Sequence, residues 1–256
     1  MASDPHTTAN LRRIAQRLLP LIDLTSLNDS DDAAVVERLC ARARTPAGNV
    51  AAVCIHAPHI PVAKRALVGT DVPIATVTNF PAGAADVAAA AEETAKAVAL
   101  GADEVDVVFP YGALIAGDRT VGLELVKASK AACGGKVLLK VILETGQLKT
   151  PQLIRAASDI AIAGGADFIK TSTGKTQPGA SLEAAEVMLG AISDARAQRR
   201  WVGFKASGGV RTVSEAQAYL ALADRMLGDG FASAATFRVG ASALLDDVLI
   251  CLGLDA

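Results

Sequence analysis

Short apolar runs alternate with longer amphipathic stretches along nearly the whole chain. Eight of these runs, most of them rich in Val, Ile or Phe and too short for a globular helix, are typical of buried strands. The predicted strands span residues 21–25, 50–55, 74–78, 104–109, 137–143, 167–171, 201–205 and 237–240.

The stretches between the strands carry helical patterns. Segment 29–44 begins with acidic residues and ends with basic ones, which complements the dipole of a helix. Segment 151–163 stops at Gly164, and glycine is common where helices end. A pattern at 7–19 predicts an extra helix before the first strand. The other predicted helices span residues 84–100, 121–132, 181–196, 213–223 and 241–252.

Eight strand–helix alternations predict an α/β fold, a (β/α)₈ TIM barrel with an extra N-terminal helix. An open doubly wound sheet is the alternative, but no G-x-G-x-x-G sequence follows the first strand. The repeat of about 30 residues is even, and about 250 residues is a common length for a barrel. No linker rich in Pro, Gly or Ser is long enough to separate domains, so residues 1–256 are expected to form one domain.

The composition mainly argues against certain classes of protein, namely those that bind nucleic acid, are secreted or cross a membrane. The net charge of −2 leaves no basic footprint for nucleic acid, while 51% hydrophobic residues supply a large core. The four cysteines form no CxxC pair or zinc-like spacing, which favours a reducing cytosol. The N-terminal residues lack the apolar region of a signal peptide, and no uncharged apolar run is long enough to cross a membrane. We therefore expect a cytoplasmic protein that binds neither nucleic acid nor membrane.

Five charged residues interrupt the predicted strands, and they mark the candidate chemistry. They are Asp23, Asp106, Lys140, Lys170 and Lys205. A single lysine in a buried strand could be a snorkelling side chain or half of an ion pair. Three lysines on three neighbouring strands about 4.8 Å apart would crowd one another, and crowded, desolvated cations lower the pKa of one amine. A neutral amine is the nucleophile of Schiff-base catalysis.

A Schiff base lets a neighbouring carbon–carbon bond break and leaves an enamine that must be protonated. The site therefore needs an acid–base group, and Asp106 and Asp23 are the candidates. Asp106 could instead form only a salt bridge that neutralises one lysine, although the two roles are compatible.

Glycine-rich loops after the last three predicted strands indicate a phosphate site. The sequences are "STGKT" at 172–176, "SGGVR" at 207–211 and "GAS" at 240–242. Glycines let backbone N–H groups approach an anion, and the loops after strands seven and eight are the usual phosphate site of a barrel. A P-loop is excluded, because Ile169 stands where the motif needs glycine.

Metal binding is not expected. The three histidines are His6, His56 and His59. The spacing of His56 and His59 could place both on one helical turn, but no cluster of carboxylates or thiolates accompanies them.

Several segments together resemble the deoxyribose-phosphate aldolase family. They are "DLTSLN", "NVAAVCI", "TVTNFPAG", "GADEVDVVFPYGAL", "VLLKVILETGQL", "GADFIKTSTGK", "GFKASGGVRT" and "FRVGAS", and they cover 23–242. The resemblance implies a barrel enzyme that reversibly cleaves 2-deoxy-D-ribose 5-phosphate to D-glyceraldehyde 3-phosphate and acetaldehyde, without a cofactor and with small phosphorylated sugars and aldehydes as its ligands.

The same resemblance assigns roles to residues. It implies that Lys170 forms the Schiff base, that Lys205 lowers the pKa of Lys170, and that Asp106 takes part in proton transfer with Lys205 and a water. Asp23 and Lys140 would support this polar network. The residues that would surround the phosphate are Thr173, Gly174, Lys175, Gly208, Gly209, Gly240 and Ser242.

The chain departs from the family pattern at two places. Ala243 stands where a second serine often follows "GAS", so one phosphate contact would be missing. The chain ends in "GLDA" where some members have a tyrosine that assists proton transfer, and its tyrosines are Tyr111 and Tyr219. Two other functions remain open at this stage, a Schiff-base aldolase for another phosphorylated sugar and a non-catalytic sugar-phosphate-binding barrel. The sequence also leaves open whether the chain forms a homo-oligomer.

Overall fold

The predicted strand regions form one closed barrel in the computed structural model, which describes residues 5–255. Every neighbouring pair in the barrel is parallel, and the last strand pairs with the first. The open sheet is therefore excluded, and the fold is a (β/α)₈ barrel. Its strands are β1 Ile22–Thr25, β4 Ala52–Ile55, β5 Ile74–Thr78, β6 Glu104–Val108, β7 Leu138–Ile142, β8 Phe168–Lys170, β9 Gly203–Ser207 and β10 Phe237–Ala241.

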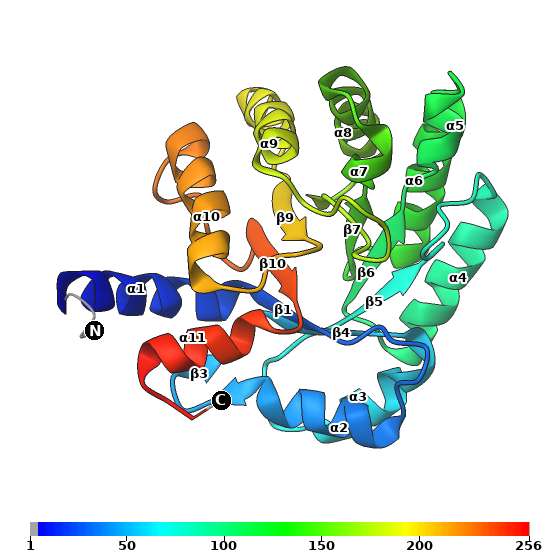
Figure 1. Cartoon of the computed structure of the whole chain (residues 1–256). Coiled ribbons are helices and arrows are strands. Elements are labelled where there is room, and N and C mark those ends of the chain that lie inside the picture. Colours follow the sequence, from blue (N-terminus) through cyan, green and yellow to red (C-terminus); the bar gives the residue numbers. More distant parts are fainter. Residues whose placement is uncertain (1–4, 256) are drawn as a thin grey trace.

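Helices surround the barrel (Figure 1). The long ones are α1 Pro5–Leu18, α2 Ala33–Arg42, α4 Val87–Leu100, α6 Thr120–Cys133, α8 Pro151–Gly164, α9 Leu182–Ala197, α10 Val213–Leu227 and α11 Leu244–Leu252. The shorter ones are α3 Ile60–Ala66, α5 Tyr111–Ile115 and α7 Thr145–Leu148, together with the 3₁₀ turns η1 Leu19–Leu21 and η2 Ala57–His59.

Several predicted boundaries are wrong. Helix 29–44 is observed only as α2, because Asp32 caps its start and Arg44 enters a small hairpin of β2 Arg44–Thr45 and β3 Gly48–Asn49. Helix 241–252 begins three residues later, since Ala241 ends β10. Strand 201–205 is shifted to β9, which begins at Gly203. Helix α3 was not predicted, because it has only seven residues and two prolines, Pro58 and Pro61, lie before and within its first turn.

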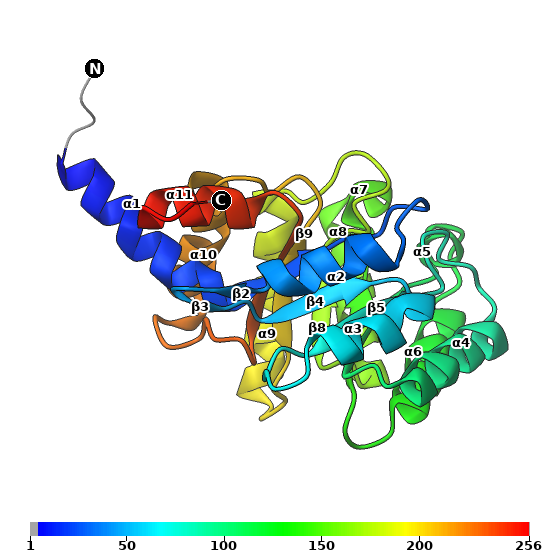
Figure 2. The same cartoon turned by 90° about the horizontal axis from the view of Figure 1, so that it is seen from below.

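Local signals fix where the helices begin and end. Thr150 caps α8 by accepting a hydrogen bond from the Leu153 N–H, and Gly165 ends the helix in the left-handed conformation. Thr212 and Glu215 form a reciprocal capping box at the start of α10. The N-terminal helix α1 packs against α10 and α11, which brings the two ends of the described chain to one side of the barrel (Figure 2).

Alternation along the strands separates two buried environments. Val105 and Val107 of β6 join the large core between strands and helices, whereas Glu104 and Asp106 are buried inside the barrel. The same alternation places one charged side chain inside on each of β7, β8, β9 and β10. On the side of β4 and β5 the interior is lined instead by a separate apolar cluster, Leu27, Ala52, Cys54, Ala75 and Val77. One wall of the barrel interior is therefore charged and the other apolar.

Candidate active site

Seven charged side chains meet inside the barrel, and none is more than 4% exposed. They come from six strands and connect through ion pairs. The cluster consists of Asp23, Glu104, Asp106, Lys140, Lys170, Lys205 and Arg238. All five residues that interrupt the predicted strands are therefore brought together, and Glu104 and Arg238 are additions that sequence reasoning missed.

Asp106 lies at the centre of this charged cluster. Its Oδ1 accepts a hydrogen bond from Lys140 Nζ at 2.8 Å, and its Oδ2 accepts from Lys170 Nζ at 2.9 Å and Lys205 Nζ at 2.8 Å. Strand register explains the arrangement, because Asp106 pairs with Lys140 on β7, and Lys170 pairs with Lys205 on β9. A single carboxylate thus holds all three amines.

The other two carboxylates divide their oxygens between lysine and arginine. Asp23 Oδ2 accepts from Lys205 Nζ at 2.5 Å, and Asp23 Oδ1 accepts from Arg238 Nη1 at 2.5 Å. Glu104 Oε1 accepts from Arg238 Nη2 at 2.8 Å, and Glu104 Oε2 lies 2.5 Å from Lys140 Nζ. These contacts satisfy the buried charges, as burial of an ion in a protein interior requires.

The three lysines differ in how many carboxylates they contact. Lys140 contacts three, with Asp23 at 3.6 Å as the most distant, Lys205 contacts two, and Lys170 contacts only Asp106. Lys170 also ends its strand, on the side of the barrel where the loops of the mouth begin. Lys170 is therefore the amine whose positive charge is least compensated.

The pKa directions follow this difference. Burial, together with the positive charge of Lys205, lowers the pKa of Lys170 although Asp106 opposes the shift. Burial also acts against the charged forms of Lys140 and Lys205, but Asp106 and the other carboxylates outweigh it and raise the pKa of both amines. The pKa values of Asp23 and Asp106 fall, because the cations around them outweigh the effect of burial. The geometry thus favours a neutral amine at Lys170 beside an ionised Asp106.

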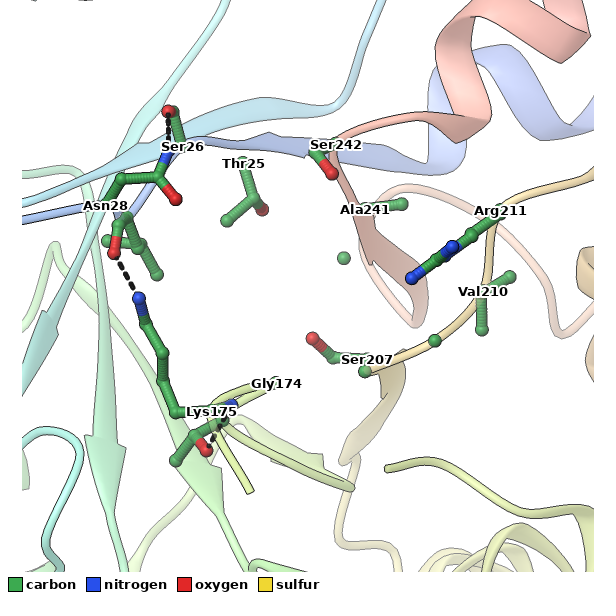
Figure 3. Close-up of a pocket in the computed structure, with 15 residues that line it drawn as sticks. Thr25, Ser26, Asn28, Gly174, Lys175, Ser207, Val210, Arg211, Ala241 and Ser242 are labelled. Carbon is green, nitrogen blue, oxygen red and sulfur yellow. Dashed lines mark hydrogen bonds between the residues drawn. The ribbon is translucent and has the colours of Figure 1, made fainter. Parts of the chain in front are cut away.

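A cavity of about 290 Å³ opens at the mouth of the barrel above this cluster (Figure 3). All seven residues predicted to surround a phosphate line it, namely Thr173, Gly174, Lys175, Gly208, Gly209, Gly240 and Ser242. Gly240 links the cavity to the charged cluster, because a Cβ atom at this position would lie 2.9 Å from Lys205 Cε. A ligand in the cavity could therefore extend down towards the lysines.

The cavity is polar, and some of its groups were not predicted. Figure 3 shows the Arg211 guanidinium and the Ser207 and Ser242 hydroxyls directed into it. The Lys175 ammonium instead crosses the mouth and donates to the Leu27 carbonyl at 2.6 Å. Arg211 lay within the predicted "SGGVR" loop, and its position at the end of a glycine-rich turn was the signal that could have found it.

Glu144 is a further buried residue that the sequence did not single out. It follows β7 in the left-handed conformation with φ of 57°. Its carboxylate accepts hydrogen bonds from the Thr173 hydroxyl at 2.5 Å and from the Thr173 N–H at 3.3 Å. Thr173 lines the cavity, so Glu144 holds one of its walls in place.

No metal site is evident within residues 5–255. No three His, Cys, Asp or Glu side chains among the described residues are grouped so that they could hold an ion. His56 precedes η2 and His59 ends it, three residues later in the same turn, and no such group surrounds them among the described residues. In the same part of the chain, no helix has the length and apolar character needed to span a membrane.

Solved structures similar to this chain include three aldolase-named proteins. A chain from Coccidioides immitis named "putative deoxyribose-phosphate aldolase" is 30% identical, with a TM-score of 0.77 over 91% of this chain and 85% of that one. A Toxoplasma gondii chain of the same name is 23% identical, with a TM-score of 0.87 over 96% of both. The deoxyribose phosphate aldolase of Aeropyrum pernix, described as a unique tetramer, is 22% identical, with a TM-score of 0.71 over 95% of this chain and 92% of that one.

A family model agrees with these likenesses. The model described as "DeoC/LacD family aldolase" matches residues 17–248, which include every strand of the barrel and all seven members of the charged cluster. The chain belongs to the DeoC/LacD family of aldolases.

Proposed function

We propose that the protein reversibly cleaves 2-deoxy-D-ribose 5-phosphate to D-glyceraldehyde 3-phosphate and acetaldehyde through a Schiff base on Lys170. One observation carries the proposal: Lys170, buried and 2.9 Å from a single carboxylate, lies below a cavity lined by glycine-rich loops. Membership of an aldolase family and the names of similar structures agree with this choice.

The reaction uses the neutral amine of Lys170 as the nucleophile. Its nitrogen attacks the aldehyde carbon of the open-chain sugar, and uptake of one proton with loss of water leaves an iminium ion. Removal of the proton from the C3 hydroxyl then breaks the C2–C3 bond, and the bonding electrons move onto C2 to form an enamine. D-glyceraldehyde 3-phosphate leaves, C2 takes up a proton, and water hydrolyses the imine to acetaldehyde and the free amine.

Asp106 and Lys205 supply the proton transfers in this proposal. Asp106 Oδ2 lies within hydrogen-bond distance of both Lys170 and Lys205, so a proton can pass between these groups, directly or through one water. Lys140 and Asp23 keep Asp106 and Lys205 oriented by direct ion pairs. These four residues keep the roles that the family resemblance implies.

The phosphate is proposed to bind in the cavity at the mouth. Gly208, Gly209, the Ser242 hydroxyl and the Arg211 guanidinium line that space, and backbone N–H groups of glycine-rich loops can bind an anion. Ala243 contributes no side-chain cap at the start of α11, so the contact of a second serine is absent here. Lys175 would have to leave the Leu27 carbonyl to reach the phosphate.

Tyrosine does not supply the enamine proton in this proposal. Tyr219 is buried on α10, outside the barrel, and Tyr111 begins α5 with a pKa that burial raises. Protonation of the enamine is assigned instead to the Asp106–Lys205 pair with a water.

Trapping with borohydride tests the proposal. The protein is incubated with deoxyribose 5-phosphate, the imine is reduced, and the modified peptide is located by mass spectrometry. We expect a secondary amine on Lys170. An adduct on Lys205 or Lys140 would contradict the residue roles while keeping the chemistry, and an adduct only with another phosphorylated sugar would change the substrate. A folded protein that forms no adduct would be a non-catalytic sugar-phosphate-binding barrel.

A further inference from the structure

Arg238 differs from the three lysines of the buried cluster, because a guanidinium keeps its proton even in a protein interior, whereas a buried amine can lose it. It occupies the same level of the barrel as two lysines, because Lys170 pairs with Lys205 and Lys205 pairs with Arg238 across neighbouring strands. It is 4% exposed, and its guanidinium lies 5.7 Å from the centre of the Phe168 ring. Arg238 is therefore a fixed positive charge in the interior of the barrel.

Arg238 acts on the carboxylates and does not contact the cavity. Its two terminal nitrogens engage Asp23 Oδ1 at 2.5 Å and Glu104 Oε1 at 2.8 Å. The other oxygen of Asp23 accepts from Lys205. The other oxygen of Glu104 lies 2.5 Å from Lys140 Nζ and also accepts a longer hydrogen bond, 3.3 Å, from Arg238. Arg238 thus engages two of the three carboxylates that the lysines also contact.

The consequence reaches Lys170 through Asp106. Lys140 and Lys205 each form an ion pair with Asp106, Lys140 at Oδ1 and Lys205 at Oδ2. Lys170 also contacts Oδ2 and so shares this oxygen with Lys205. Four cations face three carboxylates in this interior. The interior is electrically neutral only when one lysine has no proton, and the amine with the fewest carboxylate contacts loses it at the lowest cost.

We propose that Arg238 and Glu104 form a positioning pair that sets the number of protons in the barrel interior, so that Lys170 is the lysine left as a free amine. Neither residue touches the reacting atoms; both act through Asp23, Lys140 and Asp106. The inference rests on the proposed function, because it concerns the state in which Lys170 attacks the substrate.

Two opposite substitutions follow from the count of charges. Arg238→Gln leaves three carboxylates facing three lysines, so all three lysines keep their protons and Lys170 becomes neutral only at higher pH. Glu104→Gln leaves four cations facing two carboxylates, so Lys170 becomes neutral at lower pH. The double variant restores the original balance.

The remaining groups near Lys170 do not alter this expectation. The other charged groups around Lys170 are Asp23 on β1, Asp106 on β6, Lys140 on β7 and Lys205 on β9. The parent, the two single variants and the double variant all retain them. On β4, Cys54 is buried, and burial raises the pKa of its thiol above the ordinary value. It stays uncharged at neutral pH and contributes no charge to the count.

The experiment measures the initial rate of borohydride trapping on Lys170 against pH in the parent, Arg238→Gln, Glu104→Gln and the double variant. For the loss of one charge from this buried cluster, we expect a shift of about one pH unit to higher pH in Arg238→Gln and to lower pH in Glu104→Gln. The double variant should return to the parent profile within a few tenths of a unit. Arg238→Lys puts a titratable amine in place of the fixed charge, so its pH profile should lie between those of the parent and Arg238→Gln.

Arg155→Gln is the matched control, because it removes a partly exposed arginine from an ion pair with Asp159 on α8 and should leave the profile unchanged. Loss of rate at every pH without a shift, and without recovery in the double variant, would overturn the proposal and leave Arg238 a purely structural residue. If Arg238→Gln does not fold, Glu104→Gln decides, and an unshifted profile overturns the proposal. Failure of the proposed function is separate, since the parent itself would then give no adduct on Lys170 at any pH.

Discussion

Asp106 contacts all three buried lysines, and a substitution there can separate imine formation from proton transfer. In Asp106→Asn the three lysines lose the carboxylate that they share, and this carboxylate opposes the lowering of the Lys170 pKa. The pKa of Lys170 should therefore fall further. The carboxylate that moves protons is gone. We therefore expect borohydride trapping on Lys170 to persist while turnover falls by about 10²–10⁴-fold, the range for loss of an acid–base group.

Single-turnover kinetics with deoxyribose 5-phosphate measures both steps for Asp106→Asn. Asp159→Asn on the exposed face of α8 is the control for loss of an aspartate, and it should leave both rates unchanged. Loss of trapping in parallel with turnover, in a protein with the parent's melting temperature, would contradict the separation of the two steps.

The residues of the charged cluster could be predicted from the sequence to different degrees. Asp106, Lys140, Lys170 and Lys205 stand out because apolar residues flank them within predicted strands. Glu104 and Arg238 stand at the beginning of their strands, where a charged residue ordinarily marks the transition to solvent, so only the closed barrel shows that they are buried. Which charged side chains form ion pairs depends on the register between neighbouring strands. The hydrophobic pattern of the sequence does not specify this register.

At the scale of the elements, β8 and β9 depend on a glycine for close packing. A Cβ atom at Gly203 would lie 2.3 Å from the Phe168 ring, which occupies the barrel interior. Gly203→Ala should therefore lower the free energy of unfolding by about 1–3 kcal/mol, as overpacking in a core does. Chemical denaturation measures this change.

Gly190→Ala is the matched control for Gly203→Ala, because Gly190 lies within α9 with open space around the position of a Cβ atom. It should raise stability by about 0.5–1 kcal/mol, since alanine favours a helix over glycine. Equal effects of the two substitutions would show that the Phe168 ring moves away freely.

The loops after β7 and β8 are joined by Glu144 and Thr173. Glu144→Ala removes the acceptor of the Thr173 hydroxyl and leaves that wall of the cavity unsupported. Loss of such a buried contact costs about 1–3 kcal/mol, so KM for the phosphorylated sugar should rise about tenfold or more. Glu144→Gln keeps an oxygen acceptor and should recover part of the loss.

Steady-state kinetics with 2-deoxyribose that lacks the phosphate provides the comparison for Glu144→Ala. Its kcat/KM should change less than that of the phosphorylated sugar, because the Thr173 wall belongs to the proposed phosphate site. Equal losses for both sugars would place the role of Glu144 in the chemistry or in the stability of the fold.

Elements with a regular pattern were predicted well, and irregular ones were not. The alternation of eight strands with helices indicated the barrel, and Gly164 indicated the end of α8 to within one residue. Helix α3 and the β2–β3 hairpin are too short for periodicity to show. The cavity could be predicted as a set of loops, but the bond from Lys175 to the Leu27 carbonyl arises only when loops far apart in sequence meet.

At the scale of the whole molecule, the charged cluster couples stability to pH. The pKa values of Asp23 and Asp106 are lowered in the folded protein, so their contribution is present above the unfolded value of 3.8 and is lost as pH falls below it. The pKa values of Lys140 and Lys205 are raised, so their contribution is present below the unfolded value of 10.5 and is lost as pH rises above it.

The contribution of these four groups to the free energy of unfolding should therefore be broadly constant between about pH 4 and pH 10 and fall outside this range. Urea denaturation across pH measures it. The effect of Lys170 on stability has the opposite sign, because its pKa is lower in the folded protein than in the unfolded chain. Between these two pKa values the folded protein binds fewer protons, so the free energy of unfolding rises slightly with pH. A steep loss of stability between pH 5 and pH 7 would contradict this assignment.

The two halves of the chain divide the interior charges by sign. The carboxylates Asp23, Glu104 and Asp106 all precede β7, whereas the four cations all lie on β7 to β10. Two copies of either half could not close on each other, since they would enclose charges of one sign. Fragments separated between α6 and β7 should consequently reject their own copies and assemble with one another, so the same charges that prepare the nucleophile also select which half-barrels join.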